Sequence, residues 1–182
     1  MKSIRIYLSG SIKKGEKDVN QSYWTESDEK FIKNNIKDYT VELLNPATAD
    51  IRRSDPFSNF GADLYLVTSS DFLMADLREG RGIGVGCEMT IAKFFRIPVI
   101  SICPCESHYR KSKLQVYGEE LHNWIHPMVV GLSDVVVGNL PEAVAWVNGF
   151  LASPKAVKDS KLFQEAIEYY KKMEVIQERS RR

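Results

Sequence analysis

DFLMADLREGRGIGVGCEMT, residues 71–90, is the part of the chain that most clearly predicts an architecture. Residues 72–75 form an apolar run between Asp71 and Asp76, which is typical of a buried parallel strand that carries polar groups to its carboxyl end. A polar, glycine-rich loop follows, and the sequence GVGCE at 84–88 begins a helix. In an open α/β sheet, ligands bind where the carboxyl end of a strand meets the amino terminus of a helix. The sequence therefore predicts a binding site at this junction.

Two glycines and one acid at the start of this helix are candidates for that site. Gly84 and Gly86 leave backbone N–H groups open to a ligand, and the helix dipole favours negative charge there. Glu88 lies one turn further in, where the same dipole should help to keep its carboxylate ionised. An ionised carboxylate in a binding crevice is a candidate nucleophile. The alternative is that Glu88 only stabilises the first turns of the helix.

Predicted strands alternate with predicted helices along the rest of the chain. We expect strands at 4–8, 41–44, 72–75, 98–102 and 135–137, and helices at 24–37, 60–69, from 84 onward, at 119–130 and at 141–151. Residues 103–116 are expected to be irregular. Five short strands separated by helices predict an α/β fold: a doubly wound, flavodoxin- or Rossmann-like parallel sheet with strand order 2-1-3-4-5 and flanking helices.

The C-terminal part of the chain differs in character from the rest. Residues 1–153 are expected to form one α/β domain, since 182 residues with 43% hydrophobic content can build a single core. Residues 154–182 contain eight basic and five acidic residues. Phe163, Ile167, Tyr170 and Ile176 recur there at roughly helical spacing. This pattern predicts an extra, charged amphipathic helix packed on the domain through a narrow apolar stripe.

Composition also limits the partners of the chain. A net charge of +1 gives no broad electrostatic footprint for polymeric nucleic acid. No apolar run approaches the roughly 20 residues of a membrane span. Three cysteines, an odd number, favour a reducing compartment, so we expect a cytoplasmic protein.

We expect neither a metal nor a cofactor. Cys103, Cys105 and His108 form a C-x-C-x-x-H sequence with no fourth ligand nearby. His122 and His126 are four residues apart but lack the Glu of the H-E-x-x-H zinc motif.

The loop after the first strand is a second chemical element. Gly10 and Ser11 supply N–H groups and a hydroxyl directly after the strand, and Lys13 adds a positive charge. Such a loop can hold a phosphate or a sugar, although it matches neither common phosphate-loop motif, and small residues after a first strand occur in many α/β folds. A long loop at 47–59 carries Arg52 and Arg53; it either covers the pocket or is simply solvated.

These pieces together resemble the nucleoside 2-deoxyribosyltransferase superfamily. The matching parts are YLSGSIK at 7–13, Asp63 ahead of the third strand, and GVGCE at 84–88. The sequence is most similar to the 2′-deoxynucleoside 5′-phosphate N-hydrolase branch, whose first loop has the form Y-x-x-G-S-I-[RK]-x-G. The resemblance covers roughly residues 4–102. The loop before Gly84, which carries Arg78 and Arg81, and the residue Cys87 depart from the pattern of that branch.

The resemblance implies roles for individual residues. Glu88 would be the nucleophile at C1′ of the sugar, Asp63 the acid that manages the proton on the base, and Tyr7 a third residue of the catalytic group. Gly10, Ser11, Ile12, Lys13, Gly84 and Gly86 would bind the sugar and phosphate side of the substrate. From their places at the end of the strand and in the loop that follows, we expect Asp76 and Arg81 to bind the substrate as well. Independently of the family, N-glycosidic cleavage calls for one carboxylate to stabilise or capture C1′ and a second carboxyl group to protonate the base.

The expected activity is hydrolysis of the N-glycosidic bond of a (deoxy)nucleoside 5′-monophosphate. Transfer of deoxyribose between bases is the first alternative, and a non-catalytic nucleotide sensor is the second. The charged tail ending in Arg181 and Arg182 does not suit a terminus placed in an active site, as in the transferases, and therefore favours hydrolysis. We also expect a homodimer or larger homo-oligomer that closes the pocket across an interface. The apolar residues of 119–132 would form that interface or pack on their own sheet.

Overall fold

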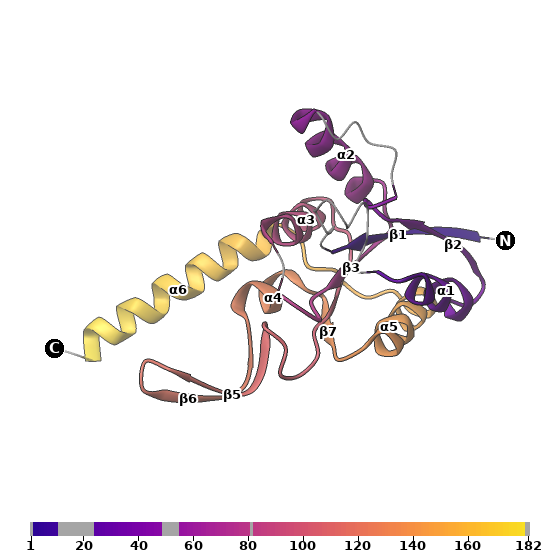
Figure 1. Cartoon of the computed structure of the whole chain (residues 1–182). Helices are drawn as coiled ribbons and strands as arrows, with labels where there is room; N and C mark the ends of the chain where they lie inside the picture. Colours follow the sequence, from indigo (N-terminus) through magenta and orange to yellow (C-terminus); the bar gives the residue numbers. More distant parts are fainter. Residues whose placement is uncertain (1, 11–23, 49–54, 81, 181–182) are drawn as a thin grey trace.

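The computed structural model of the chain describes residues 2–10, 24–48, 55–80 and 82–180, without the side chains of 175–180. These residues form a five-stranded parallel sheet with helices on both faces, a separate two-stranded sheet and a long C-terminal helix (Figure 1). The predicted α/β class with a five-stranded parallel sheet is therefore confirmed. None of the described helices is long and apolar enough to cross a membrane.

The parallel sheet has the order β2-β1-β3-β4-β7. Its strands are β1 (Lys2–Ser9), β2 (Tyr39–Leu44), β3 (Phe72–Asp76), β4 (Val99–Ile102) and β7 (Val135–Val137). Because β7 is the fifth strand of this sheet in chain order, the predicted order 2-1-3-4-5 is confirmed. The chain moves outward from β1 to β2 and then crosses to β3 on the other side of β1. The carboxyl ends of β1 and β3 therefore form the switch point at which ligands bind in such sheets.

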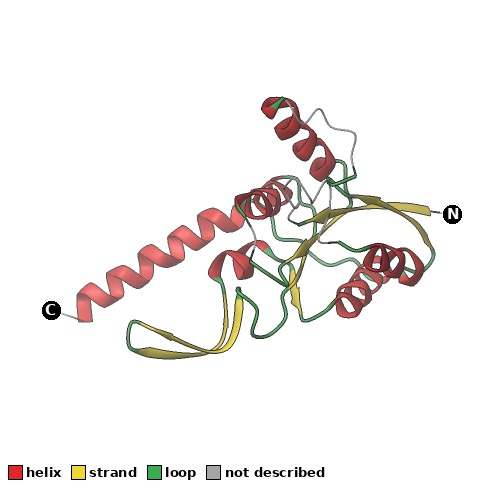
Figure 2. Ribbon diagram, in the orientation of Figure 1, coloured by secondary structure: helices red, strands yellow, loops and turns green. Residues whose placement is uncertain are grey.

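Helices cover both faces of this sheet (Figure 2). On one face, α1 (Glu26–Asn35) and α5 (Leu140–Ala152) share a core with Ile6 and Leu8 of β1. On the other face, α2 (Pro56–Thr68), α3 (Ile83–Phe94) and α4 (Pro127–Leu132) share a core with Tyr7. Alternate residues of a strand point to opposite faces, so the sequence of β1 divides its side chains between the two cores.

Four helices, α1, α2, α4 and α5, begin at residues whose side chains accept from their first N–H groups. Thr25 and Asp28 form a capping box at α1. Asp55 caps α2, which begins at Pro56, four residues earlier than predicted, because an acid followed by proline is a strong start signal. At α3 the N-cap is Gly82, which offers no side-chain oxygen, so no side-chain cap occupies the amino terminus of this helix.

The region 110–125 differs from the prediction. The expected irregular segment and helix are instead an antiparallel hairpin, β5 (Arg110–Val116) and β6 (Glu119–Ile125). Tyr117 and Gly118, both with positive φ, form the two-residue turn, as type I′ hairpin turns require. Leu121, Trp124, Ile125 and Met128 happen to recur at helical spacing, which produced the wrong assignment. The turn at Gly118 was the stronger signal.

The C-terminal helix α6 (Lys161–Ser180) projects from the body of the molecule (Figure 1). Its first turn is attached: Phe163 packs on the core of the α3 face, and its ring lies 5.6 Å from that of Phe94. Further along, Ile167 and Tyr170 are exposed. Of the stripe residues whose side chains are described, Phe163 packs on the domain, and Ile167 and Tyr170 do not, because the helix axis leads away from the sheet.

A buried ion pair joins three segments on this face. Lys93 of α3 is fully buried and donates to Asp134 from Nζ, at 2.5 Å. The same carboxylate accepts from the backbone N–H groups of Val99 and Lys158. Burial lowers the pKa of Lys93, and the bonds to Asp134 oppose that fall. Asp134 therefore connects α3, the start of β4 and the segment that leads to α6.

Replacement of Asp134 should unfold the chain far more easily than replacement of an exposed acid. Asp134→Ala leaves a buried, uncompensated ammonium group and should lower the free energy of unfolding by about 3–5 kcal/mol. Glu120→Ala, which removes exposed ion pairs with Lys113 and His122, should cost about 1 kcal/mol or less. Urea denaturation measures both. Adding Lys93→Met to Asp134→Ala should recover part of the loss; no recovery would contradict the assigned cause.

Candidate functional site

Ser9 and Glu88 join the end of the central strand to α3. Ser9 is the last residue of β1 and is fully buried. Its hydroxyl donates to Oε2 of Glu88, with an O–O distance of 2.5 Å. Glu88 is the sixth residue of α3, so the first turns of the helix carry it to the switch point between β1 and β3. A carboxylate thus lies at the position where this class of sheet binds ligands.

Tyr7 lies two residues before Ser9 and points to the same face of the sheet. Its side chain is fully buried, and its hydroxyl has no hydrogen-bond partner of good geometry among the described residues. Burial raises the pKa of Tyr7, and the nearby charges of Glu88 and Asp63 raise it further. Tyr7 is therefore a neutral phenol that can donate a proton toward the carboxylates. The hydroxyl lies near enough to the Glu88 carboxylate to lower the pKa of that group, although no hydrogen bond of good geometry joins the two side chains.

Asp63 brings a second carboxyl group to the cluster. It lies in the middle of α2, which packs against α3. Its charge raises the pKa values of both Glu88 and Tyr7, which places it within electrostatic range of the two side chains. The three residues predicted to be catalytic, Glu88, Asp63 and Tyr7, are thus brought together from α3, α2 and β1.

The pKa of Glu88 is raised above its ordinary value. Burial is the main cause, and the charge of Asp63 adds to it, while the hydroxyls of Ser9 and Tyr7 partly oppose the rise. The sequence led us to expect the helix dipole to keep Glu88 ionised. Desolvation outweighs that effect here because the carboxylate, although part of the residue stays accessible, is largely surrounded by β1 and α3.

A second charged cluster lies beside the first. Arg78, just after β3, donates from Nε to Oδ1 of Asp76 at 2.9 Å and from Nη2 to Oδ2 of Asp28 at 3.1 Å. Its guanidinium lies 5.5 Å from the ring centre of Trp24. Burial acts to lower the pKa of Arg78, but the bonds to Asp76 and Asp28 outweigh it and raise the pKa. Burial acts to raise the pKa of Asp28, and hydrogen bonds from Arg78 and Thr25 outweigh it and lower that pKa.

This cluster connects the β3–α3 loop to the start of α1. Asp76 is buried at the end of β3 and accepts both the side chain and the backbone N–H of Arg78. The structure therefore gives Asp76 a part in holding the loop. Its predicted contact with a ligand stays a prediction.

Gly10 shows how closely Trp24 approaches the strand end. The indole Nε1 of Trp24 donates to the carbonyl of Ser9 at 3.1 Å. A Cβ atom at Gly10 would lie 3.2 Å from the same Nε1, which is tighter than ordinary contact. The small residue after β1 therefore has a packing reason, since it lets the indole hold the Ser9 carbonyl beside the site.

The other predicted binding residues do not all lie beside Glu88. Gly84 lies next to Glu88: a Cβ there would be 3.8 Å from Oε1. Gly86 instead lines a cavity on the opposite face of α3. Ser11, Ile12, Lys13 and Arg81 lie outside the described residues, as do Arg52 and Arg53.

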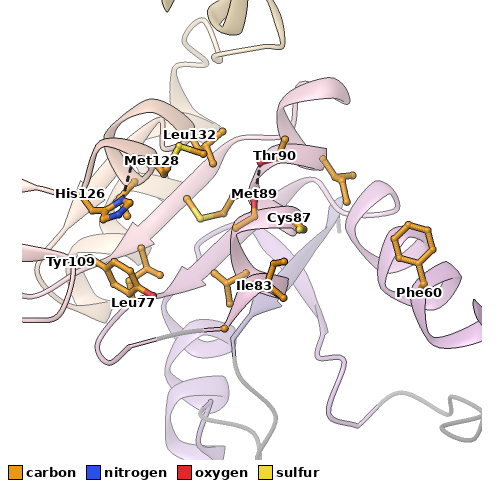
Figure 3. Close-up of a pocket in the computed structure, with 15 residues that line it drawn as sticks. Phe60, Leu77, Ile83, Cys87, Met89, Thr90, Tyr109, His126, Met128 and Leu132 are labelled. Carbon is orange, nitrogen blue, oxygen red and sulfur yellow. Dashed lines mark hydrogen bonds between the residues drawn. The ribbon is translucent and has the colours of Figure 1, made fainter. Parts of the chain in front are cut away.

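The cavity beyond α3 is apolar and has a volume of about 600 Å³ (Figure 3). It lies between α3 and α4, and Phe60 of α2, Ile83 of α3 and Met128 of α4 are exposed on its border. Glu88, Tyr7 and Ser9 do not line it. The cavity is therefore distinct from the carboxylate cluster, and α3 separates the two.

The described residues contain no group of three or more His, Cys, Asp and Glu side chains placed to hold a metal ion. The C-x-C-x-x-H residues do not converge: Cys103 is buried and lies 3.4 Å from the hydroxyl of Ser107, whereas Cys105 is exposed.

Sequence reasoning missed three features of this region: the position of Ser9, the pair of Arg78 and Asp28, and the contact of Trp24 with Ser9. Ser9 could have been found, because it ends the central strand at the switch point, where side chains face a ligand. The pairing of Arg78 with Asp28 joins residues 50 positions apart and has no sequence signal. The sequence predicted only that Trp24 is a large apolar residue at the start of a helix. Its contact with Ser9 depends on how α1 packs on the sheet.

Comparison with known proteins supports the fold. No protein-family model matches the sequence, and neither does any curated protein. Among solved structures, the 2-desoxiribosyltransferase from Leishmania mexicana aligns with a TM-score of 0.55 and 14% identity, over 84% of this chain and 99% of that one. The 2-deoxyribosyltransferase from Bacillus psychrosaccharolyticus aligns over 85% of this chain and 98% of that one, with 14% identity and a TM-score of 0.48. The first likeness shows that this chain has the α/β fold of a 2-deoxyribosyltransferase.

The raised pKa of Glu88 predicts a stability cost that depends on pH. The folded chain holds the Glu88 proton more tightly than the unfolded chain does. The free energy of unfolding therefore falls as pH rises through the window between the unfolded pKa, about 4.3 for an ordinary glutamate, and the higher pKa of the folded chain. Glu88→Gln should therefore be more stable than wild type at pH 7, by about 1.4 kcal/mol for every tenfold difference in proton affinity between the folded and unfolded chains. The gain should vanish below pH ~4.

Denaturant titrations of wild type and Glu88→Gln at several pH values test this. Glu174→Gln is the matched control, because Glu174 is exposed on α6 and far from the cluster; it should leave stability unchanged at every pH. A Glu88→Gln protein that is less stable than wild type at pH 7 would show that the carboxylate is not a source of strain.

Proposed function

We propose that this chain is an N-glycosidase that hydrolyses a (deoxy)nucleoside 5′-monophosphate to the free base and the sugar 5-phosphate. The observation that carries the proposal is the enclosed Glu88 carboxylate, which accepts from Ser9 and lies beside Tyr7 and Asp63 at the switch point of the sheet. The shared fold with a 2-deoxyribosyltransferase and the sequence motifs at 7–13 and 84–88 support the same substrate class.

The reaction proposed for Glu88 has two steps. Its carboxylate attacks C1′ of the sugar, a C–O bond forms, and the C–N bond breaks with its electron pair leaving on the base. Water then attacks C1′ and gives its proton to the Asp63 carboxylate, which was left ionised when the base was protonated. The glycosyl–carboxylate bond breaks, and the Glu88 carboxylate is regenerated. Such a transition state resembles an oxocarbenium ion, which a carboxylate stabilises electrostatically. Partial desolvation of Glu88 makes its charge more available to C1′ than a hydrated carboxylate would be.

Asp63 and Tyr7 are assigned the remaining proton chemistry. Asp63 protonates the departing base, so that a neutral molecule leaves, and Tyr7 and Ser9 orient the Glu88 carboxylate through their hydroxyls. Two carboxyl groups that lie close together tend to share one proton, because two negative charges repel each other. At one pH, one group is then protonated and can act as the acid, while the other is ionised and can act as the nucleophile. The charge of Asp63 raises the pKa of Glu88, which supports one proton shared between the two groups; when Asp63 holds that proton its charge is gone, and Glu88 ionises more easily.

Two other activities fit the same cluster. A deoxyribosyltransferase would use the glycosyl intermediate but pass the sugar to a second base, and a nucleotide sensor would bind without turnover. Base release measured with and without an acceptor base separates the three. Release without an acceptor indicates hydrolysis, release that requires an acceptor indicates transfer, and binding without release indicates a sensor.

We further propose that the protein works as a homo-oligomer. The expected interface helix at 119–130 is instead the β5–β6 hairpin, and only Pro127–Leu132 is helical. Met128 of this helix is still exposed, and with Phe60 and Ile83 it borders the apolar cavity on the α3 face. Exposed apolar residues from three helices around one cavity are typical of a surface that a partner covers.

Removal of the proposed nucleophile should stop the reaction without unfolding the protein. Glu88→Ala should lower base release by at least about a thousandfold, because the cleavage loses its main electrostatic stabilisation. Asp63→Asn should also be severe, but less so for substrates whose base leaves easily, because these need less protonation. Base release is measured chromatographically, and circular dichroism checks the fold. Turnover by Glu88→Ala at the wild-type rate would exclude the mechanism.

Phosphate recognition should appear as a preference for nucleotides. Ser11, Lys13, Arg81 and the open N–H groups near Gly84 are the proposed contacts with the 5′-phosphate. Charge-assisted hydrogen bonds contribute about 1.5–3 kcal/mol each, so kcat/KM for a 5′-monophosphate should exceed that for the nucleoside by roughly tenfold or more. Lys13→Ala should reduce this ratio and leave nucleoside cleavage unaltered. Equal kcat/KM values for the two substrates would favour the transferase instead.

A further inference from the structure

A series of contacts runs from the start of α1 to the Glu88 carboxylate. Thr25 and Asp28 form the capping box that begins α1, so the direction in which the chain enters this helix is fixed. Trp24 is the residue directly before this cap, and only 3% of it is exposed. The start of the helix therefore holds the indole of Trp24 against the carboxyl end of β1.

Contacts on two sides hold the ring of Trp24. The guanidinium of Arg78 lies 5.5 Å from the ring centre, within the range of a cation–π attraction. Arg78 is itself held by charge-assisted bonds, at 2.9 Å to Asp76 and at 3.1 Å to Asp28. Gly10 approaches the indole so closely that an added Cβ would lie 3.2 Å from Nε1. These contacts leave the indole little freedom to turn, so its N–H keeps one direction.

Ser9 connects this indole to the carboxylate. Its carbonyl accepts from Nε1 of Trp24 at 3.1 Å, and its hydroxyl donates to Oε2 of Glu88 at 2.5 Å. Ser9 is the last residue of β1, where the pairing with β3 ends, so the contact at its carbonyl adds to what the pairing provides. A turn of the backbone that broke the bond to the indole would also move the hydroxyl relative to Glu88.

We propose that Trp24 is a positioning residue for the nucleophile: by holding the Ser9 carbonyl, it keeps the Ser9 hydroxyl on the Glu88 carboxylate. Its effect passes through Ser9, whose backbone accepts from the indole and whose side chain donates to the carboxylate. A hydrogen bond to the ionised form of an acid stabilises that form. The ionised form is the one that attacks C1′, so the kinetic consequence of this role rests on the proposed function, whereas the contact itself does not.

Titration of Glu88 in the ligand-free chain tests the contact without any substrate. The carboxyl carbons of glutamate are isotopically labelled, and the NMR signal that is lost in Glu88→Gln identifies the residue. Ser9→Ala should raise the proton affinity of Glu88 about tenfold, because the carboxylate loses a charge-assisted hydrogen bond. Trp24→Phe should raise it about threefold, because one neutral hydrogen bond can transmit no more than its own free energy. Tyr7 and Asp63, which also face Glu88, are unchanged in these variants.

The double variant of Ser9→Ala with Trp24→Phe shows whether the two residues act in series. If Trp24 acts through the Ser9 hydroxyl, the proton affinity of Glu88 in the double variant should match that in Ser9→Ala alone, to within about twofold. Gly10→Ala is a second approach that keeps the indole in the chain. No positive φ requires glycine at this position, and the added methyl group would displace Nε1. It should also raise the proton affinity of Glu88, and it decides the matter if Trp24→Phe does not fold.

Trp146→Phe is the matched control, because it makes the same substitution on α5, where Trp146 stacks on Phe150. It should leave the titration of Glu88 unchanged. A folded Trp24→Phe chain in which Glu88 titrates as in wild type would overturn the inference. Effects of Ser9→Ala and Trp24→Phe that simply add in the double variant would overturn it as well.

The pH dependence of base release separates this inference from the proposed function. If Glu88 is the nucleophile, the acid limb of the kcat profile should move to higher pH in Trp24→Phe, together with the titration of Glu88. A titration that moves while base release is absent, or while its profile stays in place, supports the positioning role of Trp24 and contradicts the nucleophilic role of Glu88.

Discussion

The enclosure of the Glu88 carboxylate between β1 and α3 is the constraint on which the candidate site depends. A carboxylate taken out of water is costly unless hydroxyls or charges compensate it. Ser9 supplies a direct hydrogen bond, and Tyr7 and Asp63 lie within electrostatic reach. These partners come from three elements, so the site exists only when the end of β1, the middle of α2 and the first turns of α3 meet. The same burial raises the pKa of Glu88, so its ionised form destabilises the fold.

Two other interactions hold those elements in place. The buried pair of Lys93 and Asp134 ties the far end of α3 to the start of β4 and to the segment before α6. At the near end, Arg78 bridges Asp76 and Asp28 and so fixes the β3–α3 loop against α1. Trp24 completes this arrangement by donating to the Ser9 carbonyl, which the absence of a side chain at Gly10 allows. α3 therefore carries Glu88 at one end and a buried anchor at the other.

Much of the fold and part of the site could be predicted from the sequence. The buried strand expected at 72–75 and the glycine-rich start of α3 predicted a binding site at their junction, and the order 2-1-3-4-5 was predicted together with the doubly wound class. The secondary structure of residues 110–125 was predicted wrongly. Leu121, Trp124 and Ile125 recur at helical spacing, and Tyr117 and Gly118 were not recognised as a hairpin turn. Arg78 and Asp28 could not be paired in advance, since long-range ion pairs leave no local pattern. The approach of Asp63 to Glu88 required the packing of α2 on α3, which sequence motifs imply only by resemblance.

The central proposal is that the Glu88 carboxylate attacks C1′ of the sugar and displaces the base. The most direct measurement is to mix the protein with a nucleoside 5′-monophosphate whose 2′ position carries fluorine, which slows hydrolysis of the intermediate, and to quench in acid. Peptide mass spectrometry should then find the sugar phosphate attached to the peptide that contains Glu88, in amounts that match the base released. Base release that leaves this peptide unmodified, with the sugar phosphate attached to another residue, would contradict the proposed role of Glu88.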